Sequence, residues 1–149
     1  MAGSWPAVST FDRRREPGLD RPAVEVQTPR RFLEAREVYG VNLSGVSLVT
    51  LSACESGLGR IARGDEILGF TRSFLTAGAS GLVASLWPVA DDSTELLMTT
   101  FYGQLARGTE AIDAMREAQR AVLAQRRFAH PFFWAPFNLI GDWRLRAGA

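Results

Sequence analysis

The sequence contains no lysine, a single cysteine and a single histidine. One cysteine cannot form an internal disulfide, which excludes the class of small secreted domains held together by disulfides. The absence of lysine excludes the lysine-bearing phosphate loop of nucleoside triphosphatases. Every basic residue is an arginine, and the net charge of +1 gives no reason to expect a nucleic-acid partner.

Long apolar runs are missing as well. No stretch reaches the roughly 20 residues needed to span a bilayer, and residues 1–16 lack the pattern of a secretory signal peptide. We therefore expect a cytoplasmic protein with no membrane partner. A chain of 149 residues, 46% hydrophobic and 22% charged, is expected to form one globular domain with a sizeable core.

The first 30 residues differ in composition from the rest. They are rich in arginine and proline and show little hydrophobic periodicity, which predicts a poorly structured arm. The domain itself is expected over residues 31–146.

From residue 31 onward, helical and strand patterns alternate. Alternation of helices with apolar strands predicts an α/β layered fold with a largely parallel sheet. The strands are expected at "VSLVTLSA", "SGLVASLW" and "FNLIG", and the helices at "RFLEAREVYG", at "DEILGFTRSFLTAG" and in two successive segments between residues 92 and 123.

These two successive helices are expected to begin at side-chain caps. Asp92, followed by Glu95, matches a capping box, and Thr109 is placed to cap the second helix. Their apolar stripes are Leu97, Phe101 and Leu105 in the first helix, and Ala111, Met115, Ala118 and Val122 in the second.

Two segments follow the carboxyl ends of expected strands, where sites form in sheets of this class. Cys54 is either a small core residue or a nucleophile whose thiolate is favoured by the following helix N-terminus. Asp91 is either an acidic residue at a helix start or a carboxylate offered to a basic ligand group. If the strands are neighbours, the two segments line one crevice.

A nucleophilic cysteine needs a base, and no histidine precedes Cys54. His130 comes well after it, among aromatic residues, where a structural hydrogen bond is expected. The glycines after Cys54 do not match a nucleotide-binding spacing and predict a tight turn instead. The tryptophans Trp87, Trp134 and Trp143 are expected to pack in the core or on a domain face rather than to bind a ligand.

Several motifs, in order, resemble the CHAT domain family: "LVTLSACESGLG", "GDEILGFTRSFLTAGASGLVASLWPVADDST", "FYGQL" and "HPFFWAPFNLIGDW". This family is caspase-like, is related to separases, and is often fused to tetratricopeptide repeats in bacteria. The resemblance covers about residues 31–144. It implies a caspase-hemoglobinase fold and a cysteine–histidine dyad, without metal or cofactor. It makes Cys54 the nucleophile and Asp91 the residue that recognises a basic side chain before the scissile bond.

The chain departs from the family upstream of Cys54. The family carries its catalytic histidine in a His-Gly element at the end of an earlier strand, and that element and the first strands are missing from the sequence pattern. The resemblance therefore implies the C-terminal part of a cysteine peptidase, inactive or nearly so alone, with an exposed strand edge. The alternative is a degenerate caspase-like scaffold. The expected partners are a protein or peptide substrate and a tetratricopeptide-repeat region or a complementing chain.

Overall fold

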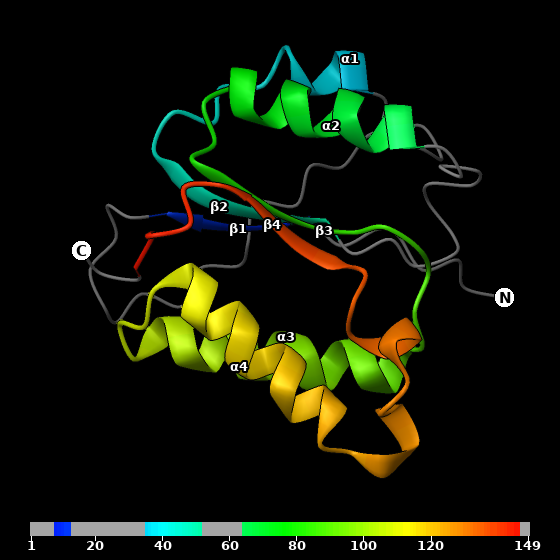
Figure 1. The fold of residues 1–149 in the computed structure, drawn as a ribbon. Coiled ribbons are helices and arrows are strands. Elements are labelled where there is room, and N and C mark those ends of the chain that lie inside the picture. The colour runs from blue at the N-terminus through cyan, green and yellow to red at the C-terminus, as the bar shows by residue number, and fades with distance from the viewer. Residues whose placement is uncertain (1–7, 13–34, 52–63, 147–149) are drawn as a thin grey trace, which may run out of the picture.

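The computed structural model describes residues 8–12, 35–51 and 64–146. They form a sheet with helices on both faces, so the layered α/β architecture is confirmed (Figure 1). One face carries α1 (Ala35–Val38) and α2 (Gly64–Thr76), and the other carries α3 (Asp91–Ala106) and α4 (Ala111–Leu123).

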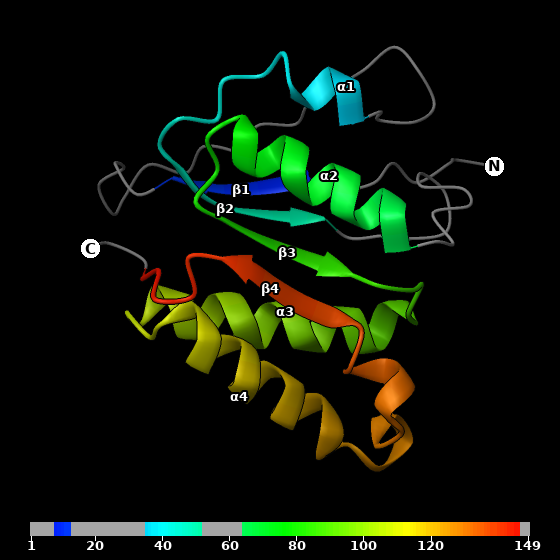
Figure 2. The same ribbon diagram turned by 45° about the horizontal axis from the view of Figure 1, so that its top comes forward.

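The described sheet has four strands in the order β1-β2-β3-β4, which Figure 2 shows side by side. The central pair, β2 with β3, is parallel, and both outer pairs are antiparallel. The prediction of a largely parallel sheet therefore holds for the centre only, and the sheet is mixed. The strands are β1 (Val8–Asp12), β2 (Val46–Leu51), β3 (Gly81–Ser85) and β4 (Phe137–Gly141).

The connections explain this mixture. One crossover containing α2 carries the chain from β2 to β3, as a parallel pair requires. Two helices, α3 and α4, lie between β3 and β4, and the second brings the chain back to the end where β3 finished. Strand β4 therefore starts there and runs antiparallel, with Phe137 opposite Ser85.

Strand β1 lies inside the segment predicted to be a poorly structured arm. Its sequence, VSTFD, contains the β-branched and aromatic residues that favour strands, and Val8 pairs with Leu51 of β2. The arginine-rich composition of residues 1–30 led to the prediction of a poorly structured arm, so the strand over these five residues was not predicted. The outer side of β2 is consequently paired, and the edges of the described sheet are β1 and β4.

The two central strands are buried on both faces, as their apolar sequences predict. Leu48 and Val83 belong to the core beneath α3 and α4, whereas Val49 and Leu82 pack with Phe74 on the α1–α2 side. The alternation of side chains along a strand produces this division. The central pair thus joins two hydrophobic cores.

Helices α3 and α4 pack closely against each other. The predicted stripes of both helices are confirmed, since all of their members are buried. The stripe of α4 contains alanines, whose small side chains let the two helices approach closely. Phe101, fully buried, fills the space between these helices and the sheet.

The predicted cap of α3 is wrong. The helix begins one residue earlier, at Asp91, and Ala90 is its N-cap without a side-chain cap bond. The hydroxyls of Ser93 and Thr94 instead donate to the carbonyl of Ala90, at 2.9 and 3.1 Å. At 16 residues α3 is the longest described helix, and none in the described ranges is long and apolar enough to cross a membrane.

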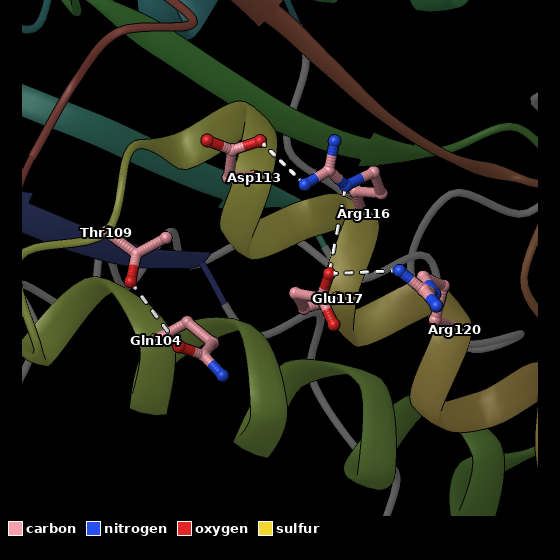
Figure 3. A network of polar contacts seen from close by, with 6 residues as sticks. All are labelled: Gln104, Thr109, Asp113, Arg116, Glu117 and Arg120. Carbon is pink, nitrogen blue, oxygen red and sulfur yellow. Dashed lines mark hydrogen bonds and ion pairs between the residues drawn. The ribbon is translucent and has the colours of Figure 1, made fainter.

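The predicted cap of α4 is also wrong, because the Thr109 hydroxyl lies 3.4 Å from Gln104 Oε1 (Figure 3). The first N–H groups of α4 are satisfied from the C-terminal segment. Ala111 donates to the carbonyl of Leu145 at 2.8 Å, and Ile112 donates to that of Trp143 at 3.1 Å. Two backbone carbonyls from the C-terminal segment thus take the place of a local side-chain cap.

Truncation of Phe101 tests the importance of the α3–α4 core. Phe101→Ala removes a fully buried ring and should lower the free energy of unfolding by about 3–5 kcal/mol. Thr99→Ala, an exposed position on the same helix, is the control and should change it by less than about 0.5 kcal/mol. Urea denaturation measures both, and equal losses would contradict the assignment of the core.

Candidate active site

The strands that precede the two candidate residues end at the same edge of the sheet. Because β2 and β3 are parallel neighbours, with Leu51 opposite Ala84, their carboxyl ends share one edge of the sheet. Strand β4 starts at the same edge. We call this the carboxyl edge. The strands preceding Cys54 and Asp91 are therefore neighbours.

The position of the candidate nucleophile follows from the sequence and from β2 alone. Cys54 lies outside the described residues, three positions after Leu51, the last residue of β2. Its role as a nucleophile stays a prediction.

Asp91 is the first residue of α3, and its side chain is exposed. A carboxylate there is favoured by the helix dipole, which explains its presence without a ligand. Its neighbour Asp92 forms an ion pair with Arg127 at 3.4 Å, and both of those side chains are 69% exposed. Such an exposed pair contributes little to stability. The role of Asp91 in recognising a basic group remains a prediction.

The loop between β3 and α3 is held in place at three points. Ser85 Oγ donates to the carbonyl of Trp87 at 2.5 Å, and the Leu86 N–H donates to the carbonyl of Pro136 at 3.0 Å. The indole Nε1 of Trp87 donates to the carbonyl of Phe132 at 3.0 Å. The last two of these bonds fasten the loop before Asp91 to the segment that precedes β4.

His130 lies in that segment, which contains the 3₁₀ turns η1 (Arg126–Phe128) and η2 (Pro131–Phe133). Its Nδ1 accepts a hydrogen bond from the N–H of Phe132 at 3.2 Å and so caps η2. The predicted structural bond of His130 is confirmed. Within the described ranges, no three histidine, cysteine or carboxylate side chains gather as metal ligands would.

The tryptophans divide into two groups. Trp87 and Trp134 are partly buried and pack as predicted, Trp87 against the Phe132 ring. Trp143 is 47% exposed, with the Arg144 guanidinium 4.4 Å from its ring centroid, so it lies at the surface and not in the core. The contact between Trp87 and Phe132 was not predicted, because only the fold brings "SLWP" and "HPFFW" together.

A buried polar contact joins the two elements that lead to the candidate residues. The hydroxyls of Thr50 in β2 and Tyr102 in α3 lie 2.6 Å apart. Thr50 is 3% exposed, so the contact is largely shielded from water. It fixes the strand before Cys54 relative to the helix that begins at Asp91.

Tyr102→Phe tests this contact. Removing the hydroxyl leaves the buried Thr50 without this partner and should lower the free energy of unfolding by about 0.5–1.5 kcal/mol. Tyr39→Phe is the matched control, because Tyr39 is 52% exposed, and it should have almost no effect. Chemical denaturation monitored by tryptophan fluorescence measures both variants. An identical midpoint for the two would show that the contact does not stabilise the fold.

Comparison with known proteins extends the structural result. The CHAT domain family matches residues 10–142. "Tetratricopeptide repeat protein 28" of Mus musculus is 37% identical over 111 residues, and that of Homo sapiens is 36% identical. The match covers 74% of this chain but only 4% of each relative's length. No solved structure gives a significant match. The chain is therefore a member of the CHAT domain family.

Proposed function

We propose that this chain is the C-terminal part of a CHAT-type cysteine peptidase domain that acts on peptides after a basic residue. The observation that carries the proposal is the parallel pairing of β2 with β3, with Leu51 opposite Ala84. This pairing places Leu51, three positions before Cys54, and the end of β3, from which the loop leads to Asp91, at the same edge of the sheet. Cleavage after a basic residue needs the nucleophile close to the carboxylate that binds that residue, because the basic residue directly precedes the scissile bond.

The proposed reaction has two steps. The thiolate of Cys54 attacks the carbonyl carbon of the scissile peptide, and its own backbone N–H stabilises the oxyanion of the tetrahedral intermediate. Collapse of this intermediate breaks the C–N bond, the amine leaves with a proton from a general acid, and a thioester remains on Cys54. Water then attacks the thioester, which releases the carboxylic acid and restores the thiol.

The proposed specificity depends on charge. An exposed carboxylate at the first turn of α3 suits a guanidinium or ammonium group, and the anchored loop holds it in place. Asp91, the first residue of α3 and the position that the family resemblance matches to the specificity residue, is the carboxylate to which we assign the substrate's basic side chain.

The chain lacks a base for this chemistry in the expected place. No histidine precedes Cys54, and Nδ1 of His130 is engaged with the N–H of Phe132. Loss of a general base lowers the rate by roughly 10²- to 10⁴-fold. In the family, the His-Gly element that carries the histidine would also supply a second oxyanion donor. Loss of that donor lowers the rate by roughly another 10²- to 10³-fold. We therefore expect the chain alone to be inactive or nearly so.

Peptide hydrolysis tests the expected activity. Fluorogenic peptides with arginine or lysine before the scissile bond should be turned over at or near the uncatalysed rate. Cys54→Ala, measured in parallel, separates cysteine chemistry from contamination. Clear hydrolysis that disappears in Cys54→Ala would show that the chain has its own base and would contradict the prediction of inactivity.

Peptide binding tests the assignment of Asp91 independently of turnover. Asp91→Asn should weaken binding of an arginine-containing peptide by roughly fivefold, which corresponds to about 1 kcal/mol for an exposed ion pair. Asp113→Asn removes a carboxylate of α4 that pairs with Arg116, and it should leave binding unchanged. Fluorescence anisotropy with a labelled peptide measures both. An equal effect of the two substitutions would mean that only the net charge matters.

A second candidate function is a scaffold that binds a partner chain. Strand β4 is an edge of the described sheet and pairs there with β3 alone, so it offers main-chain groups to an added strand. Part of this edge is already engaged, because Gln119 Nε2 donates to the carbonyl of Phe137 at 3.1 Å. A native complex in which a partner supplies a histidine near Cys54 would unite the two functions. A native complex without such a histidine would favour the scaffold.

A further inference from the structure

An aromatic pair lies at the surface beside the carboxyl edge. The rings of Trp87 and Phe132 are stacked, with centroids 6.2 Å apart and an angle of 29° between their planes. Phe132 is 46% exposed and Trp87 is partly buried. An exposed aromatic ring next to a second one is a place where another apolar group can be buried favourably.

The pair is held rigidly. The Trp87 indole donates to the carbonyl of Phe132, and the Phe132 ring meets the Phe133 ring edge-on at 5.5 Å. Phe133 in turn packs against the main core. A surface ordered before binding loses little entropy when a ligand arrives, so even a small apolar contact there raises affinity.

Acidic groups follow this pair along the chain. Asp91, Asp92 and Glu95 are all exposed on the first turns of α3, which directly follow the loop containing Trp87. Arg127, in the same segment as Phe132, pairs with Asp92. The loop and the first turn of α3 are thus joined to the segment before β4 by an aromatic contact and an ion pair, in addition to hydrogen bonds. Apolar and negatively charged groups adjoin at one edge of the sheet.

We propose that Trp87 and Phe132 form an apolar subsite for a bulky apolar side chain of the same peptide whose basic side chain pairs with Asp91. This inference rests on the proposed function and adds a second specificity element to it. The substrate class is then a peptide segment that contains arginine or lysine close to an aromatic or large aliphatic residue.

The geometry of the loop limits the spacing of these two residues. Trp87 and Asp91 are four positions apart, so their Cα atoms are separated by at most about 14 Å. An extended peptide covers that distance in about four residues. We therefore expect the apolar residue within four positions of the basic one.

The small size of the pair argues for a side chain rather than for a second copy of the chain. Two aromatic side chains offer at most roughly 300–500 Å², even if both were fully exposed. A stable protein–protein interface needs roughly 800 Å² from each partner. The adjoining carboxylates also match a basic peptide in charge.

The test measures, by fluorescence anisotropy, the binding of a set of labelled peptides to the intact chain. Each peptide carries one arginine and one varied residue, which lies one to four positions before or after the arginine. The varied residue is phenylalanine in one peptide and alanine in its counterpart. At the favoured position the phenylalanine peptide should bind roughly fivefold to tenfold more tightly than its alanine counterpart, as burial of one apolar side chain allows. Phe132→Ala should remove this preference, and Phe132→Leu should keep part of it.

Trp143→Ala is the matched control. Trp143 is 47% exposed, nearly the same as Phe132, but it follows the end of β4 that lies opposite the carboxyl edge. This variant should keep the full preference for phenylalanine. Circular dichroism checks that each variant is folded, and sedimentation velocity reports its association state.

The outcomes separate this inference from the proposed function. Arginine-dependent binding that Asp91→Asn weakens, without a preference for phenylalanine, would overturn the subsite and leave the proposed function standing. Equal losses of the phenylalanine preference in Phe132→Ala and Trp143→Ala would also overturn the subsite and leave the proposed function standing. A dimer that Phe132→Ala dissociates, with peptide preference unchanged, would identify a self-association surface instead. Absence of any arginine-dependent binding would overturn both proposals.

Discussion

The parallel pairing of β2 with β3 is the constraint on which the rest of the structure depends. Both strands are buried on both faces, so each contributes alternate side chains to two cores at once. Neither strand can shift by one residue, because every apolar side chain would then face the wrong core. The same register places the carboxyl ends of both strands at one edge, where the candidate site lies.

The α3–α4 pair converts this parallel centre into a mixed sheet. Its helices pack through alanines and fully buried apolar residues, so they return the chain to the carboxyl edge with little freedom. Strand β4 then pairs antiparallel with β3, and the C-terminal segment beyond it supplies carbonyls to the first turn of α4. On the same helix, Figure 3 shows a network of ion pairs that involves Asp113, Arg116, Glu117 and Arg120.

The family match and the strand pairing describe different properties of the chain. The match identifies a domain type over residues 10–142, whereas the strand pairing identifies which strand ends share one edge of the sheet. Three further contacts give this region its rigidity: the Thr50–Tyr102 hydroxyl pair, the Ser85–Trp87 bond and the Trp87–Phe132 stack. They join β2, β3, α3 and the segment before β4, so the loop leading to Asp91 is held by elements that are distant in sequence.

The sequence by itself determined the elements whose signals are local. Apolar runs marked β2 and β3, a repeat of about 3.6 residues marked the stripes of α3 and α4, and the FNLIG segment marked β4. Gly78 and Gly108 lie just beyond the ends of α2 and α3 with positive φ angles, which glycine adopts most easily. The order of these elements was sufficient to predict a layered α/β fold and to direct attention to Cys54 and Asp91.

Only the tertiary structure decided the rest, because the deciding partners are far apart along the chain. Strand β1 forms by pairing with β2, and the arginine-rich sequence around it did not predict a strand. The start of α4 is capped by the carbonyls of Trp143 and Leu145, so Thr109 was not needed for that role. The meeting of Trp87 with Phe132 follows from the return of the chain through α4. Local patterns specify helices and strands, but contacts between distant segments form only when both cores are assembled.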